Sequence, residues 1–199
     1  MKKLFKNLTV CMAVVASVVS GTQTSFAQRS NANYGYQTVS QTDAEDYYEA
    51  GIYYNSIEQY EAAFLMFESA AELDHKEAQF MLASYYLVGT GCVEDGITSM
   101  KWMKRSATNG CASAQMVYGK ALKEGVYVNK NEREAVRWFK KAANQGHAQA
   151  QYELALCYIE GCGVDQNIEL AAEYLYKSAK QGNEDALEFI ALLEASVGY

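Results

Sequence analysis

The chain contains no proline, although average usage of about 5% would place roughly ten in a chain of this length. Histidine is also scarce: the 199 residues include 2 His and 5 Cys, which leaves little material for a His-rich metal centre. Lys and Arg number 17 against 24 Asp and Glu, so the net charge is −7. This balance argues against a basic nucleic-acid-binding module, in which Lys and Arg cluster. Half of the residues are hydrophobic, which excludes disorder throughout the chain.

The chain also lacks an apolar run long enough to span a membrane. The N-terminal run Leu8–Val19 has 12 residues, whereas a membrane-spanning helix needs about 20. This run follows a lysine-rich start and precedes a small-residue segment that ends at Ala27. That order is typical of a secretory signal peptide. We therefore expect residues 1–27 to be cleaved after Ala27, which leaves a periplasmic or secreted protein with no membrane span.

Cleavage would make the protein more acidic. The segment 1–27 carries three lysines and no acidic residue, so its removal changes the net charge from −7 to −10. The next residues, 28–43, are rich in Ser, Gln, Asn and Thr and show no helical periodicity. We expect them to form a flexible polar spacer.

The rest of the chain repeats with a period of 36 residues, which is the signature of stacked supersecondary units. Alanine recurs in one column, glycine in two others, and an aromatic residue in a fourth. These columns are Ala78, Ala114, Ala150 and Ala186; Gly89, Gly125 and Gly161; Gly110, Gly146 and Gly182; and Trp102, Trp138 and Tyr174.

Each unit is predicted to contain two helices. In the third unit, apolar residues at helical spacing predict helices over 114–124 and 132–144, and Gly125 and Gly146 end them. Mid-helix small residues predict close helix packing, because Gly119 would otherwise only weaken its helix. The fold class is therefore all-α, with four helix pairs and a final helix near 184–195.

The repeats resemble two related families. The segment AQYELALCYIEGCGVDQNIELAAEYLYKSAKQGN and the segment WFKKAANQGHAQA are similar to Sel1-like repeats. Residues 44–77 resemble a tetratricopeptide repeat, residues 78–113, 114–149 and 150–185 resemble Sel1-like repeats, and residues 186–199 are expected to form a capping helix. The resemblance implies a right-handed α-solenoid that serves as an adaptor or scaffold for protein complexes.

Two further classes of function remain open at this point. Some cysteine-rich relatives carry a β-lactamase label, so the alternative is an envelope hydrolase or a protein that binds cell wall or β-lactams. The mature chain has no S-x-x-K, S-D-N, K-T-G or G-x-S-x-G motif, so we expect no enzyme activity, catalytic residue, metal or cofactor. The third class is a structural subunit that stacks with its own copies, and the apolar final helix favours self-association.

Four cysteines lie in the mature chain, and an even count in an exported protein favours disulfides. Cys92 and Cys111 lie in turns at opposite ends of helices, too far apart for the roughly 7 Å between Cα atoms that a bridge allows. Cys157 and Cys162, which straddle a helix end, are the candidate pair. The alternative is four free thiols.

The resemblance also implies a binding surface. In tetratricopeptide-like solenoids the first helix of each unit lines the concave groove, where a protein or peptide binds. Carried over by position, the groove residues are Tyr48, Ile52, Asn55, Phe80, Ser84, Leu87, Met116, Lys120, Lys123, Tyr152, Leu156 and Ile159. We expect Phe80, Met116 and Tyr152 to form an apolar stripe and Lys120 and Lys123 a basic island. The alternative is that these residues belong to the core.

Overall fold

The computed structural model describes residues 41–197. The predicted signal peptide and residues 28–40 of the predicted spacer lie outside the described residues. Residues 41–43, which we expected to belong to the spacer, are already helical. The first helix therefore begins before the apolar pattern that locates it in the sequence.

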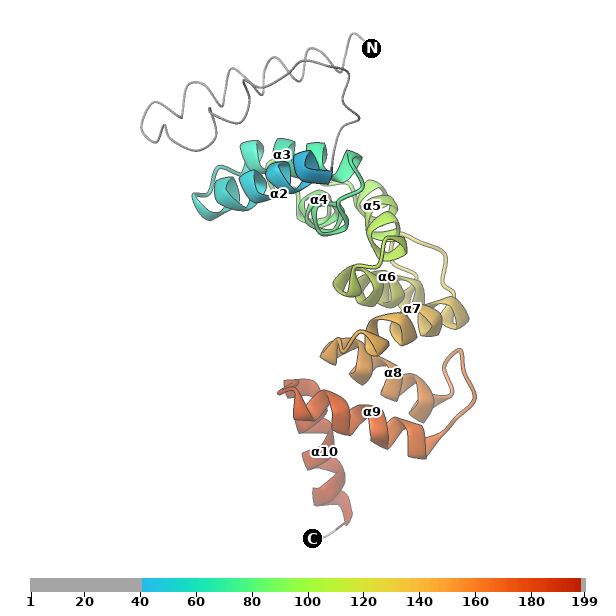
Figure 1. Ribbon diagram of the computed structural model, residues 1–199. Helices are drawn as coiled ribbons and strands as arrows, with labels where there is room; N and C mark the ends of the chain where they lie inside the picture. Colours follow the sequence, from blue (N-terminus) through green and yellow to red (C-terminus); the bar gives the residue numbers. More distant parts are fainter. Residues whose placement is uncertain (1–40, 198–199) are drawn as a thin grey trace. The chain divides into compact units, whose positions relative to one another are not determined.

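The described residues form nine helices and no strands, which confirms the all-α prediction. Consecutive helices pack against each other in chain order, as four pairs followed by a last single helix (Figure 1). The helices are α2 (Gln41–Ser56), α3 (Tyr60–Glu72), α4 (Lys76–Val88), α5 (Gly96–Thr108), α6 (Ala112–Glu124), α7 (Glu132–Asn144), α8 (Ala148–Glu160), α9 (Ile168–Lys180) and α10 (Glu184–Val197).

Glycine and asparagine replace proline as the signals that end and begin helices. At the end of α6, Gly125 takes a left-handed φ of 79°, and its N–H bonds to the carbonyl of Ala121. A residue with a Cβ adopts this conformation only at a cost. At the start of α7, the side chain of Asn131 accepts a hydrogen bond from the N–H of Glu134. Such caps satisfy backbone groups that the helix leaves unpaired.

The small residues in the first helices have the packing role that the sequence predicts. A Cβ added to Gly119 of α6 would lie 2.8 Å from the ring of Phe139 on α7, closer than van der Waals contact allows. In the first pair, Gly51 of α2 has the same relation to Phe67 of α3. In these two pairs the second helix thus packs a large ring against the backbone of the first, whereas the equivalent positions in the other two pairs are Met103 and Leu175.

The predicted core is largely confirmed. The repeat pattern predicts that the core consists of six columns, each with equivalents 36 and 72 residues later: Leu82, Ala83, Tyr86, Trp102, Met103 and Ala107. In these columns Leu82, Met103, Phe139, Leu154 and Leu175 are buried. A few members of the same columns are only half-buried; these are Tyr86, Trp102, Tyr174 and Ala179. Part of each of these side chains remains in contact with solvent.

We predict that Phe139→Ala lowers the free energy of unfolding by about 3–5 kcal/mol, because it removes a fully buried ring and leaves a cavity above Gly119. Urea denaturation followed by circular dichroism measures the change. Tyr176→Ala on α9 is the matched control, since that side chain is 66% exposed and should change stability by about 0.5 kcal/mol at most. Equal losses in the two variants would contradict the core assignment.

Candidate functional site

The twelve predicted groove residues lie on the first helices α2, α4, α6 and α8, and we call their surface the first-helix face. None of the twelve is buried. Ile52 and Lys120 are exposed, and the other ten are half-buried. The face is therefore open to solvent, while most of its side chains also touch the interior. Whether a partner binds there stays a prediction.

The expected apolar stripe has a double role. Phe80, Met116 and Tyr152 are each half-buried and pack against the buried core. Tyr152 also meets Phe189 of α10 edge to face, with ring centroids 6.5 Å apart. The stripe thus combines the two interpretations left open by the sequence, because part of each side chain packs against the core and part remains accessible.

The expected basic island is reduced by an ion pair. Lys123 Nζ lies 3.3 Å from Glu153 Oε2, and the two side chains are only 20% and 9% exposed. Burial acts to lower the pKa of Lys123, but Glu153, together with Cys157 and Glu160, outweighs it, so the pKa is raised. Lys123 is therefore charged and already neutralised by Glu153. Lys120, one turn earlier, is exposed and keeps its cation on the first-helix face.

The predicted residues of the first units are held by specific contacts. Tyr48 stacks on the ring of His75 with centroids 4.4 Å apart. The Asn55 side-chain oxygen accepts a 2.6 Å hydrogen bond from the Tyr85 hydroxyl, and the Ser84 hydroxyl donates to a backbone carbonyl of its own helix. These polar groups already have partners, so this end of the face offers mainly apolar surface.

The four cysteines among the described residues are free thiols, and no disulfide joins Cys157 and Cys162 in this structure. The two residues do straddle the end of α8, and the N–H of Cys162 bonds to the carbonyl of Cys157. Their side chains have different surroundings. Burial raises the pKa of the Cys157 thiol to about 12, whereas the Cys162 thiol is half-buried and hydrogen-bonds to Glu132. A thiol with the pKa of Cys157 stays protonated and is a poor nucleophile.

The two histidines cap helices. His75 Nδ1 accepts a hydrogen bond from the N–H of Ala78, and His147 Nδ1 accepts from the N–H of Ala150. Burial lowers the pKa of His147, which favours the neutral ring that this cap requires. Over residues 41–197, no group of three or more His, Cys, Asp or Glu side chains could hold a metal ion.

A column of buried glutamines, which sequence reasoning missed, links the repeats. Gln115 Nε2 donates to the carbonyl of Ala107 on the preceding helix at 3.0 Å, and Gln115 Oε1 accepts from Gln145 at 2.8 Å. Gln79 and Gln151 repeat both bonds with their own neighbours. The 36-residue spacing of the three glutamines was the available signal. We call this network the glutamine relay.

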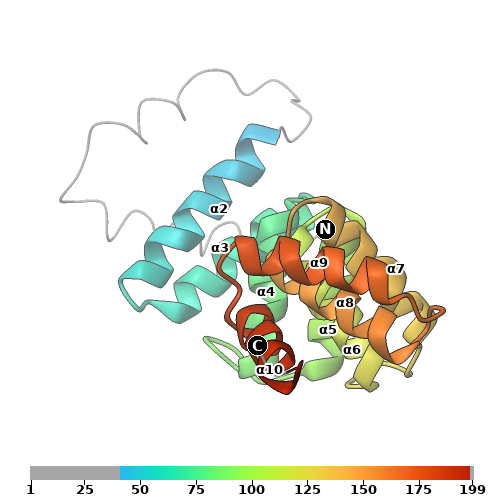
Figure 2. The ribbon, with the colours of Figure 1, turned by 90° about the horizontal axis from the view of Figure 1, so that it is seen from below.

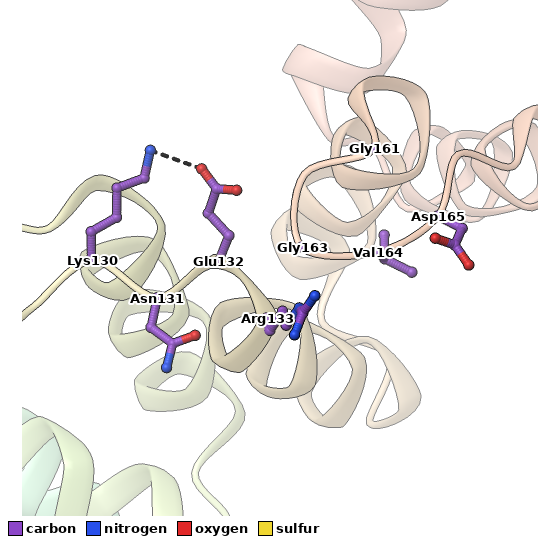
Figure 3. Close-up of a pocket in the computed structure, with 8 residues that line it drawn as sticks. All are labelled: Lys130, Asn131, Glu132, Arg133, Gly161, Gly163, Val164 and Asp165. Carbon is purple, nitrogen blue, oxygen red and sulfur yellow. Dashed lines mark ion pairs between the residues drawn. The ribbon is translucent and has the colours of Figure 1, made fainter.

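One polar pocket of about 580 Å³ lies where the turn before α7 meets the turn after α8 (Figure 3). Its charges largely compensate one another, since Lys130 forms a 2.8 Å ion pair with Glu132. At the equivalent junction one unit earlier, the ring of Tyr127 packs directly on Gly96. The residues that line the pocket are Lys130, Asn131, Glu132, Arg133, Gly161, Gly163, Val164 and Asp165.

Comparison with known families identifies these helix pairs. A family model described as Sel1 repeat matches residues 44–75, 76–111, 112–147 and 148–183. The chain belongs to the Sel1 repeat family. The model also matches the first unit, which we expected to be tetratricopeptide-like, and each later match begins two residues before the predicted boundary. No curated protein matches the chain.

Solved structures of Sel1 repeat proteins are similar to this chain. A Sel1 repeat protein from Oxalobacter formigenes is 34% identical over 63% of this chain and 94% of its own, with a TM-score of 0.60. The protective antigen c5321 of uropathogenic Escherichia coli is 31% identical, with a TM-score of 0.68. That match covers 72% of this chain and 32% of the antigen.

A more distant structure agrees in fold. Cysteine-rich protein B of Helicobacter pylori is 20% identical over 78% of this chain and 99% of its own, with a TM-score of 0.50.

In the part of this Sel1 repeat protein that the structure describes, no helix is long and apolar enough to cross a membrane.

We predict that Lys123→Met destabilises the protein by about 1–3 kcal/mol, because it leaves the Glu153 carboxylate buried without its partner. Adding Glu153→Gln should recover part of the loss by removing that charge. Urea denaturation of the single and double variants measures both effects. Lys177→Met is the matched control: its pair with Glu173 is exposed and should contribute at most about 1 kcal/mol. A Lys123 effect no larger than the Lys177 effect would contradict this account.

Proposed function

We propose that this Sel1 repeat protein is an exported adaptor or scaffold that binds a protein or peptide along the first-helix face. Sel1 repeat proteins generally act in protein–protein interaction. The observation that carries the proposal is the half-buried apolar stripe, Phe80, Met116 and Tyr152, which recurs at one position in successive units. A stripe with that spacing suits a partner segment that runs across several units.

The rigidity of the face supports this function. The glutamine relay and the Lys123–Glu153 pair join neighbouring units, so the first helices are fixed relative to one another before a partner arrives. Binding to such a preformed surface avoids the entropy cost of ordering it. Lys120 adds an exposed cation beside Met116, and a carboxylate on the partner would complement it.

The alternative function, an envelope hydrolase or a β-lactam-binding protein, gains no support from the described residues. The buried Cys157 thiol is protonated, and both histidines are engaged as helix caps. In the polar pocket near α7, Glu132 pairs with Lys130, and burial raises the pKa of the neighbouring Cys162 thiol, so this thiol is not activated as a nucleophile. We therefore propose a non-enzymatic role.

The binding proposal predicts that Met116→Ser with Lys120→Glu reduces capture of the protein partner by about tenfold or more, because it removes apolar contact and reverses a charge. Chemical crosslinking in envelope fractions, followed by mass spectrometry, identifies and quantifies the partner. Lys120 is exposed and Met116 is only half-buried, so the helical circular dichroism spectrum should be unchanged.

A matched control carries the same two changes on a second helix. Ile97→Ser with Lys101→Glu alters an exposed apolar residue and an exposed lysine four residues later on α5. This variant should capture the partner as the wild type does. Equal capture by the α6 variant and the wild type, with both folded, would move binding away from the first-helix face.

The export proposal predicts a mature chain that begins at Gln28. Ser25 and Ala27 are small residues at the positions that a signal peptidase reads. The intact mass of protein extracted from the envelope measures the N-terminus. A mass that retains residues 1–27, or that includes a lipid, would contradict cleavage at this site.

A further inference from the structure

The last helix, α10, has the phase of a first helix without the second helix that accompanies the others. It begins 36 residues after α8, and its Ala186 is buried in the column of Ala78, Ala114 and Ala150. In each of the four units a second helix covers the first. Among residues 41–197, α10 packs against α9 and closes the stack (Figures 1 and 2). Its opposite side lacks an equivalent cover within the described residues.

That uncovered side has the form of a helix-binding seat. Ala191 occupies the column of Gly119, which receives the ring of Phe139 in the third unit, and Ala191 is exposed. Leu187, one turn earlier, is 49% exposed, and Ile190 between them is half-buried. We call Leu187, Ile190 and Ala191 the α10 seat. A small residue next to a large apolar one, as Gly119 is next to Tyr118, is the arrangement that elsewhere in this chain accepts a second helix.

Leu187 makes this seat different from the internal ones. It stands in the column of the buried glutamines Gln79, Gln115 and Gln151, whose side chains accept a hydrogen bond from the end of the covering helix. A leucine offers no acceptor, so a helix on the α10 seat would be held by apolar contact alone at this point. The bound helix therefore does not need a side-chain amide donor at its end, as the internal covering helices do.

Charge identifies the kind of helix that fits. The helix α10 carries four acidic residues and no Lys, Arg or His; the acidic residues are Glu184, Asp185, Glu188 and Glu194. Two copies joined through α10 would bring these like charges together, which disfavours a second copy as the occupant. Inside the chain, α5 covers α4, and α5 carries three basic residues and no acidic one.

We propose that the α10 seat binds a basic amphipathic helix of a partner protein, placed against α10 as α5 is placed against α4. This contact continues the internal helix-on-helix interface of the repeats beyond the last described unit. It is separate from the first-helix face and goes beyond the function proposed for that face. The partner helix presents a large apolar residue to Ala191 and Lys or Arg to the acidic residues of α10.

A peptide with the sequence of residues 95–109, which includes α5, serves as the probe. Fluorescence anisotropy measures its binding to the whole chain, and we expect saturable binding that weakens as salt is added. Leu187→Lys should weaken binding by about tenfold or more, since it places a charge in the seat and repels the basic peptide. Leu192→Lys is the matched control, because Leu192 is 63% exposed on another side of α10 and should change affinity by about twofold at most.

The charge-reversed peptide, the comparison of the two leucine variants and the oligomeric state provide further tests of the proposal. A peptide with its three basic residues changed to Glu should not bind, and equal binding would overturn the charge argument. Equal losses from Leu187→Lys and Leu192→Lys, or no saturable binding of the basic peptide, would overturn the seat. A dimer that Leu187→Lys dissociates in sedimentation would make the occupant a second copy. The Met116→Ser with Lys120→Glu variant should bind the peptide normally, so failure here is distinguishable from failure at the first-helix face.

Discussion

The glutamine relay is the constraint on which the register of the repeats depends. A glutamine buried at 0–5% exposure must have partners for both ends of its amide, because an unpaired buried amide costs about 1–3 kcal/mol. Its NH₂ group binds a carbonyl at the end of the preceding second helix, and its oxygen binds the end of the following one. Both bonds form only when three successive helices meet at one angle and height. Apolar packing alone would allow neighbouring helices to shift along one another, whereas the two hydrogen bonds of each glutamine amide fix their relative position.

The fold could be predicted from the sequence because its determinants repeat along one chain. The helix predicted over 132–144 matches α7 residue for residue, since apolar spacing locates it and Gly146 marks its end. The mid-helix Gly119 also predicted close helix packing, and the structure shows that the ring of Phe139 packs against it. The start of α2 was missed because Gln41 to Asp43 is polar, and polar residues at the outer end of a helix show no apolar periodicity.

The candidate site was less predictable, because it depends on contacts between side chains about thirty residues apart. Spacing places Lys120 and Lys123 on one helix face, but only the structure brings Glu153 to Lys123. Likewise, Cys157 and Cys162 are close in sequence, yet one thiol is directed to the core and the other to Glu132. The glutamine column was visible in the sequence, but a polar column suggests an exposed stripe until the helices that bury it are in place.

The bonds that join the units connect only neighbours, since the relay, the Lys123–Glu153 pair and the serine bond from Ser178 to the Ala148 carbonyl each span about thirty residues. No unit depends on a segment far along the chain for these bonds. Each pair of helices can therefore complete these contacts once the pair next to it is present, without waiting for more distant residues. Such local order favours rapid, sequential folding of the emerging chain.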